Sequence, residues 1–222
     1  MATVVSICNL ALSRIGDNAT ISAVGPSDGS FQAEACGRLY PIALGTCLGM
    51  HNWAFATRRV RLAAVADTMV DTMVDKGEWQ HAYAAPADCQ RAISVYRAES
   101  ESFRGSVVLA KYAHYIEEEE KIPFEVVGTD YGLVILTNAE NAGLLYVCSE
   151  PKTSQFSTVF VDALAWLLAS YLAGEIIRGE SGHAYAQNCL KQFDAMVSMA
   201  AKMDARQRHN FRDATPTWIL SR

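Results

Sequence analysis

The chain has 222 residues, a mass of 24.3 kDa and 50% hydrophobic residues, so it can bury a core as one large domain or two small ones, which excludes a disordered or fibrous protein. Its formal net charge of −5 and its pI near 5.5 argue against a sequence-independent grip on nucleic acid, which needs clustered Lys and Arg. Such mild acidity suits a surface that DNA slides past, but it is also ordinary for cytosolic proteins and speaks to solubility rather than to fold.

Residues 3 to about 56 are predicted to be helical. In the first helix, apolar residues recur on one face, and Gly16 follows them as an expected C-terminal stop. The residues of this face are Val4, Ile7, Cys8, Ala11 and Ile15. Because no basic stretch precedes them, the N-terminus is predicted to be a helix of the fold rather than a signal peptide.

A second helical segment is expected from Phe31 onward. Its candidate N-caps are Ser27, Asp28 and Ser30. Its apolar stripe recurs at steps of three and four and consists of Phe31, Ala35, Leu39, Ile42, Thr46 and Met50. Pro41 lies inside the stripe and predicts a kink, because proline lacks the N–H that a helix needs. From Trp53 the period becomes two, which predicts a short corner followed by a strand, with Trp53 and Phe55 as core residues.

Residues 57 to 150 carry the β signals. Short runs of alternating residues are Trp79, His81 and Tyr83; Ile93, Val95 and Arg97; Phe124 and Val126; and Leu133 and Ile135. Turn-rich stretches lie at residues 128–132 and 138–141. Short strands separated by turns favour an antiparallel meander over a parallel sheet with crossover helices.

Residues 151 to 209 are predicted to form two more helices. Ser154 is the expected N-cap of the first, whose apolar face holds Phe156, Phe160, Leu164, Leu167, Tyr171 and Leu172 and which ends near Gly179. Ser181 is the expected cap of the second, in which a near-coiled-coil seam holds Tyr185, Cys189, Phe193, Met196, Ala200 and Met203. The predicted fold class is α+β, a helical bundle formed by N- and C-terminal helices (1–56 and 151–209) with an inserted small antiparallel β-sheet region (57–150). The apolar runs at 39–57 and 163–174 do not predict a membrane span.

Residues 210 to 222 are predicted to leave the bundle as an extended arm, because Pro216 cannot continue a helix and biases the preceding residue toward an extended conformation. The arm ends in large apolar residues that are unusual to leave in water. Either it folds back on its own subunit or it docks on a partner, and docking is favoured because Trp is enriched at interface hot spots and two arginines can flank an acidic groove. The predicted partner-binding residues are Arg212, Pro216, Trp218, Ile219, Leu220 and Arg222.

Several pieces of the chain form one ordered set. They are His51-Asn52-Trp53-Ala54-Phe55-Ala56-Thr57-Arg58-Arg59, Trp79, Ala82-Tyr83, Pro86, Asp88-Cys89-Gln90-Arg91, Pro123-Phe124-Glu125-Val126, Ile135-Leu136-Thr137-Asn138, Leu144-Leu145-Tyr146 and the apolar helix around Ala163-Leu164-Ala165-Trp166. Together these pieces resemble the head-to-tail adaptor proteins of tailed phages, also called tail tubular protein A or portal adaptor proteins. The resemblance implies a virion protein, made in the host cytoplasm, that forms a ring, usually twelvefold, between a portal protein and a tail or nozzle protein. It also implies a helical bundle that carries a small sheet domain, and DNA that passes without sequence-specific binding.

Motifs for catalysis or for cofactor binding are missing from the sequence. It contains no G-x-G-x-x-G, Walker loop, H-E-x-x-H or G-x-S-x-G, and no catalytic residue, metal site or cofactor is predicted. The cysteines lie far apart and are expected to be buried free thiols: Cys8, Cys36, Cys47, Cys89, Cys148 and Cys189. The histidines occur singly, and His81 and His114 are expected to be packed residues rather than general bases. The four glutamates at 117–120 and the repeat with Asp67, Asp71 and Asp75 are expected to lie in loops.

Two function classes remain open. The first is a structural ring subunit that joins portal to tail and does no chemistry. The second is a small hydrolase, a virion-associated cell-wall enzyme with Glu99, Glu101 or Glu125 as its carboxylate acid. The ordered resemblance, the missing motifs and the apolar arm favour the first, while the second needs one carboxylate with a raised pKa in a cleft. The protein is therefore predicted not to be an enzyme.

Overall fold

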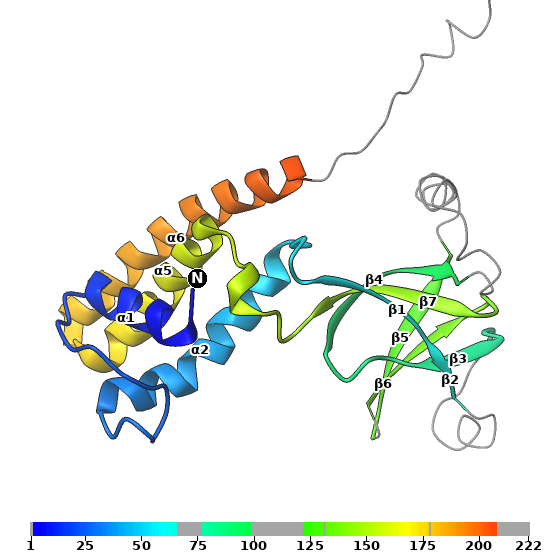
Figure 1. The fold of residues 1–222 in the computed structure, drawn as a ribbon, viewed down its shortest axis with the longest axis horizontal. Helices are drawn as coiled ribbons and strands as arrows, with labels where there is room; N and C mark the ends of the chain where they lie inside the picture. The colour runs from blue at the N-terminus through cyan, green and yellow to red at the C-terminus, as the bar shows by residue number, and fades with distance from the viewer. Residues whose placement is uncertain (1, 66–76, 99–121, 131, 178, 208–222) are drawn as a thin grey trace, which may run out of the picture. The chain divides into compact units, whose positions relative to one another are not determined.

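A computed structural model describes residues 2–65, 77–98, 122–130, 132–177 and 179–207. These residues form four α-helices and two small antiparallel sheets, about 48% helix and 24% strand (Figure 1), which confirms the expected α+β fold class. The chain divides into a helical unit, Met1–Cys47 with Thr153–Arg222, and a sheet unit, Leu48–Lys152. The sheet unit is therefore an insertion in the sequence of the helical unit.

Helix α1 (Val4–Arg14) has defined signals at both ends. At its start the Thr3 hydroxyl accepts a hydrogen bond from the Ser6 N–H at 3.1 Å, and the Ser6 hydroxyl oxygen accepts one from the Thr3 N–H at 2.9 Å. This is a capping box, which satisfies N–H groups that have no partner inside the helix. At its end Gly16 has a φ of 79°, and the N–H groups of Gly16 and Asp17 donate to carbonyls of the last turn. The predicted stop at Gly16 is confirmed.

Helix α2 (Phe31–Met50) continues through Pro41. Its cap is Ser30, one of the three expected candidates, whose hydroxyl oxygen accepts a hydrogen bond from the Ala33 N–H at 3.2 Å. The predicted apolar stripe, however, is wrong, because Ala35 is buried whereas Phe31, Ile42, Thr46 and Met50 are exposed. The buried stripe holds Ala33, Cys36, Tyr40, Ala43 and Cys47. Several of these side chains are small, and small side chains let a helix approach its neighbours closely.

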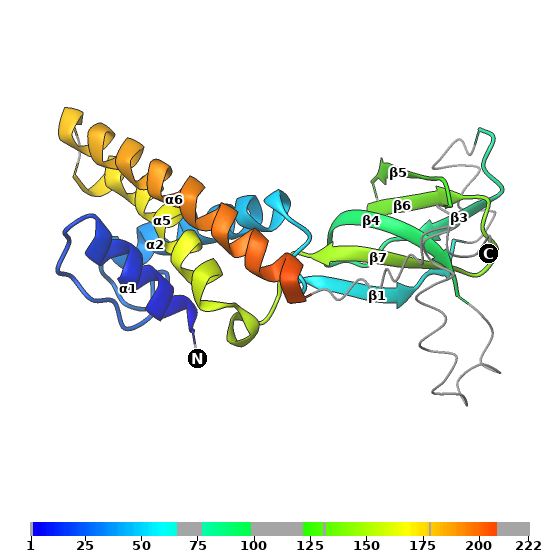
Figure 2. The same ribbon diagram turned by 90° about the horizontal axis from the view of Figure 1, so that it is seen from above.

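Helix α5 (Thr158–Ile176) packs against α1 and α6 in the helical unit (Figure 2). Its N-cap is Ser157, whose hydroxyl oxygen accepts a hydrogen bond from the Phe160 N–H at 3.2 Å. The predicted cap is wrong, because Ser154 lies in the preceding 3-10 turn η2 (Thr153–Gln155). Among the described helices α5 alone is long and apolar enough to cross a membrane by length and composition, and 56% of its apolar window is buried within the protein. The position of α5 in the core accounts for that apolar character. Its fully buried large side chains are Phe160, Leu164, Leu168 and Leu172.

Helix α6 (Gly179–Gln207) begins two residues before Ser181, which was the predicted cap. Gly179 has a φ of 67°, a conformation that glycine adopts without steric cost and that allows a sharp turn after α5. The predicted seam is correct only in part: Cys189, Phe193 and Ala200 are buried, whereas Tyr185 and Met203 are 49% and 43% exposed. The helix is thus rotated relative to the prediction, and some of its apolar residues face outward.

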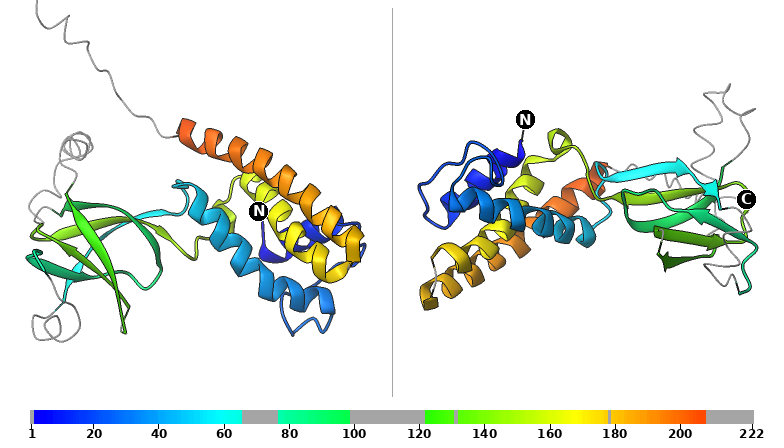
Figure 3. Two further views of the ribbon diagram at one scale, coloured as in Figure 1. Left: turned by 180° about the vertical axis from the view of Figure 1, so that it is seen from behind. Right: turned by 90° about the horizontal axis from the view of Figure 1, so that it is seen from below.

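The sheet unit contains two antiparallel sheets, in the strand orders β1-β7-β4 and β2-β3-β6-β5 (Figure 3). The strands are β1 (Thr57–Arg61), β2 (Ala63–Ala64), β3 (His81–Ala84), β4 (Cys89–Arg97), β5 (Phe124–Thr129), β6 (Gly132–Thr137) and β7 (Ala142–Cys148). The antiparallel pairing was predicted, but the meander was wrong, because β6 and β7 are joined by a short turn and yet belong to different sheets. Strand β7 is buried along nearly its whole length, which suits a central position with a partner on each side.

The predicted short corner before β1 is a turn, and the alternating residues Trp53 and Phe55 lie in this turn region rather than in the strand. The Trp53 carbonyl accepts hydrogen bonds from the N–H groups of Ala56 (3.1 Å) and Thr57 (2.9 Å) and from the Thr57 hydroxyl (2.7 Å). Strand β1 therefore begins only at Thr57. The Trp53 ring is fully buried, with the His51 ring against its edge and the Phe55 ring stacked 5.9 Å away between centroids. Trp53 is a core residue as predicted, and Phe55 is half-buried.

Candidate interaction surfaces

A polar cluster in the sheet unit joins residues from three stretches that are distant in sequence, 51–59, 88–91 and 144–146. The Arg58 guanidinium lies 2.5 Å from one Asp88 carboxylate oxygen, and the Tyr146 hydroxyl donates a hydrogen bond to the other at 2.9 Å. The Arg91 guanidinium donates to the Asn52 side-chain carbonyl at 2.6 Å. These five residues are called the polar cluster below.

The partners within the polar cluster point to a structural role. Both Asp88 carboxylate oxygens have partners, and the Asp88 carbonyl accepts a hydrogen bond from the Ser149 N–H at 2.8 Å. Burial, and after it the hydrogen bond to Asp88, raises the pKa of Tyr146 to about 12, so this phenol stays protonated at neutral pH. Because Arg58 lies in β1, Tyr146 in β7 and Asp88 just before β4, the cluster ties together the three strands of one sheet.

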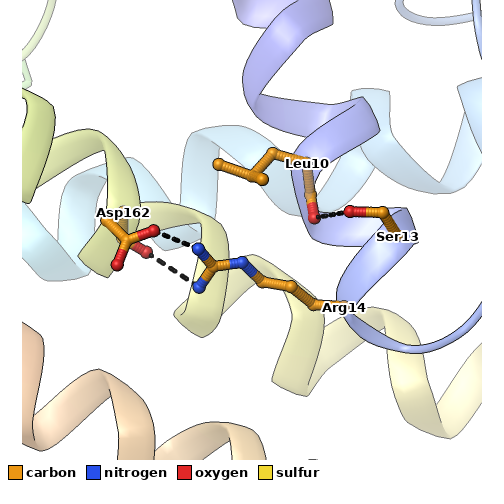
Figure 4. Close-up of polar contacts among 4 residues, drawn as sticks. All are labelled: Leu10, Ser13, Arg14 and Asp162. Atoms are coloured by element: carbon orange, nitrogen blue, oxygen red, sulfur yellow. Dashed lines mark hydrogen bonds and ion pairs between the residues drawn. The ribbon is translucent and has the colours of Figure 1, made fainter.

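A second polar contact ties α1 to α5 in the helical unit (Figure 4). The Arg14 guanidinium pairs with the Asp162 carboxylate and also donates to the Asp162 carbonyl at 3.4 Å. Its central carbon lies 3.9 Å from the centroid of the Trp166 ring, within the range of a cation–π contact. The Arg14 side chain is only 13% exposed. The sequence gives no signal for this contact, because the two helices are distant in sequence and Arg14 resembles an ordinary helix-terminal cation.

The cysteines are free thiols as predicted, and all are buried except Cys89, which is half-buried. A hydrogen bond that the Cys8 thiol donates to the neighbouring Cys36 sulfur, together with burial, raises the pKa of Cys8, and burial raises the pKa of Cys47 to about 12. Thiols held protonated in this way are poor nucleophiles and poor metal ligands. Within the described part of the chain, His, Cys, Asp and Glu form no group of three or more that could hold a metal ion.

Of the carboxylates proposed for a hydrolase, only Glu125 is among the described residues. It is exposed on β5, where its carboxylate accepts a hydrogen bond from the Trp79 indole N–H at 2.9 Å. A solvated carboxylate with such a donor lacks the apolar surroundings that make a general acid. Glu99, Glu101, the glutamates at 117–120, and Asp67, Asp71 and Asp75 lie outside the described residues, as does His114. His81 is half-buried beside Tyr83, at 6.2 Å between ring centroids.

The six predicted partner-binding residues of the arm also lie outside the described residues: Arg212, Pro216, Trp218, Ile219, Leu220 and Arg222. The described surface instead offers two largely apolar faces, and the sequence had assigned all their members except Met199 to the core. The first, the α2 outer face, consists of Phe31, Ile42 and Thr46; Phe31 and Ile42 are 48% and 58% exposed. From residue 39 to its end, α2 carries no charged side chain.

The second face, the α6 outer face, lies beside the buried seam of α6. It consists of Tyr185, Met199 and Met203, which are 43–50% exposed, and of the half-buried Met196. Successive members are separated by eleven, three and four residues, which are all close to whole helical turns, so they share one stripe. Helix faces turned toward water are normally polar, so both outer faces are candidate contact surfaces.

In comparisons with known proteins, no family model and no curated protein matches the chain.

Proposed function

We propose that the protein is a structural subunit of a head-to-tail connector ring of a tailed phage. In this role the ring joins the portal to the tail or nozzle protein and surrounds the channel through which DNA leaves. The subunit does no chemistry, and it resides in the neck of the virion.

The observation that carries this proposal is the pair of apolar outer faces on one helical unit. A closed ring is built from heterologous contacts, in which one patch of a subunit meets a different patch of the next. Helices α2 and α6 supply two such patches, and Figure 1 shows them along different sides of the helical unit, with α5 between them. Two different apolar faces on one unit suit a repeating contact better than a single ligand site.

The remaining features agree with a structural role. Trp53 and the polar cluster belong to the adaptor-like pieces of the sequence and stabilise the sheet unit, because Trp53 is fully buried and the polar side chains pair within their cluster. A net charge of −5 fits a channel that DNA passes without being held. In this proposal the arm at residues 210–222 anchors the ring to the portal.

Particle mass tests the proposal. The purified protein is mixed with portal rings from the same phage, and the mass of the complexes is measured in solution. We expect one discrete species whose added mass corresponds to a complete ring. If the protein and the portal rings keep their separate masses, the proposal is wrong.

The arm is tested in the same assay by deletion of residues 216–222. We expect a truncated subunit that folds but no longer joins the portal stably, because the apolar end of the arm is missing. Wild-type affinity of the truncated subunit would show that the arm is not the anchor, while ring formation by the full chain would still support the ring itself.

A further inference from the structure

The α6 outer face is a stripe of large apolar side chains that other described residues do not fully cover. From Tyr185 to Met203 it spans 18 residues, or about 27 Å at 1.5 Å per residue. Its members carry no charge, and three of the four are methionines. Methionine is flexible and polarizable and makes favourable contacts with the edges of aromatic rings. The face therefore suits an apolar partner with an aromatic side chain.

The C-terminal segment, residues 208–222, has the composition of such a partner. It follows Gln207, the last residue of α6, directly and contains Phe211, Trp218, Ile219 and Leu220. Trp218 is eleven residues beyond Gln207, so an extended chain can carry it up to about 36 Å from the end of α6. Tyr185, at the far end of the face, lies 22 residues before Gln207, or about 33 Å along the helix, so Trp218 can reach every position along the face.

We propose that, in the free subunit, residues 208–222 fold back and pack on the α6 outer face of the same chain. The short tether favours this occupant over a second copy, because a linker of this length gives an effective concentration in the millimolar range. The same contact removes two apolar surfaces from water at once, the face on α6 and the end of the segment.

This docking concerns the free subunit and stands without the connector ring. If the ring forms as proposed, the portal competes for residues 208–222. Release of this segment from α6 then exposes the α6 outer face, which can contact the next subunit. That second step rests on the proposed function, whereas the docking itself does not.

Oxidation of methionines by hydrogen peroxide tests the docking in the full chain without a portal. Peroxide converts an accessible thioether to a sulfoxide, and peptide mass spectrometry gives the rate at each methionine. We expect Met199 and Met203 to be oxidised several-fold more slowly in the full chain than in a chain that lacks residues 216–222. Met50, which is 53% exposed at the end of α2, is the internal control and should react equally in both. Equal rates at Met199 and Met203 in the two chains would overturn the proposal.

Point variants keep the test independent of truncation. Trp218→Ser should raise the oxidation rates of Met199 and Met203 toward those of the truncated chain, whereas Ser221→Ala, the matched control in the same segment, should leave them low. Protection that is unchanged on tenfold dilution supports docking on the same chain, and protection that is lost on dilution would overturn it in favour of a second copy. Attachment to the portal is measured separately, so failure of the docking and failure of the connector role are distinguishable.

Discussion

The helical unit and the sheet unit differ in where they place polar and apolar side chains. The helical unit is filled mainly by apolar side chains, with the Arg14–Asp162 pair at its edge, and it leaves apolar stripes exposed on α2 and α6. The sheet unit is held by the buried Trp53 and by the polar cluster, and its exposed large apolar residues on strands are Val126 and Leu133, on the neighbouring strands β5 and β6. Trp53 and the polar cluster therefore stabilise the sheet unit, whereas the exposed apolar stripes lie on the helices.

The largest effect is expected from Trp53→Ala in the sheet unit. The ring is fully buried, and truncation of a buried aromatic side chain costs about 3–5 kcal/mol. Urea unfolding should show this loss in the free energy of unfolding, with a smaller loss for Phe55→Ala because that ring is half-buried. An unchanged unfolding midpoint for Trp53→Ala would refute a core role for the ring.

A medium effect is expected from Arg14→Ala in the helical unit. Hydrogen bonds to charged groups contribute about 1.5–3 kcal/mol, and the stack on Trp166 adds to them, so the expected cost is about 2 kcal/mol. Arg38→Ala is the matched control, because Arg38 also pairs with a carboxylate of α5, that of Glu175 at 3.0 Å, but is 55% exposed. Exposed pairs contribute at most about 1 kcal/mol. Equal losses in the two variants, measured by urea unfolding, would show that burial does not distinguish these pairs.

A smaller effect, visible at high pH, is expected from Tyr146. Its pKa is raised to about 12 in the folded protein, whereas an unfolded tyrosine titrates near about 10. Between these values the folded state holds a proton that the unfolded state has lost, so this contribution to stability is complete below about pH 10 and disappears as the pH rises through about 12. Tyr146→Phe should flatten that part of the pH profile and cost about 1 kcal/mol at neutral pH.

Tyr40, in the helical unit, is the control for Tyr146 in the same experiment. Burial raises its pKa to about 12 as well, without a contribution from Asp88. Asp88→Asn should therefore lower the pKa of Tyr146 and leave that of Tyr40 in place, as followed by tyrosinate absorbance. If both values moved together, the assignment of Asp88 to Tyr146 alone would be wrong.

The sequence predicted those features that depend on local chemistry. Ser30 and Gly16 occupy cap positions because a hydroxyl beside free N–H groups and a glycine in the left-handed region act within one helical turn. The α+β class followed from the change in hydrophobic period at Trp53, between the helical segments and the short strands. Antiparallel pairing followed from the short strands and their turns.

The rotation of helices and the order of strands were not predictable in the same way. Helix α2 has two apolar stripes, and only tertiary packing decides that Cys36 and Ala43 face inward while Ile42 faces outward. The ion pair of Arg14 with Asp162, and that of Arg58 with Asp88, join segments that are far apart in sequence. Both outer faces were missed for this reason, since apolar residues at helical spacing were assumed to be core.

In the proposed connector ring, the helical unit supplies the contacts between subunits. The most direct test compares Ile42→Glu, in the α2 outer face, with Val126→Glu, an exposed apolar residue of the sheet unit. The mass of the complex with portal rings is measured for both variants and for the wild type, after equal stability has been verified by urea unfolding. We predict that the wild type and Val126→Glu add a complete ring and that Ile42→Glu adds none. A complete ring with Ile42→Glu at wild-type affinity would show that the α2 outer face is not a contact surface of the ring.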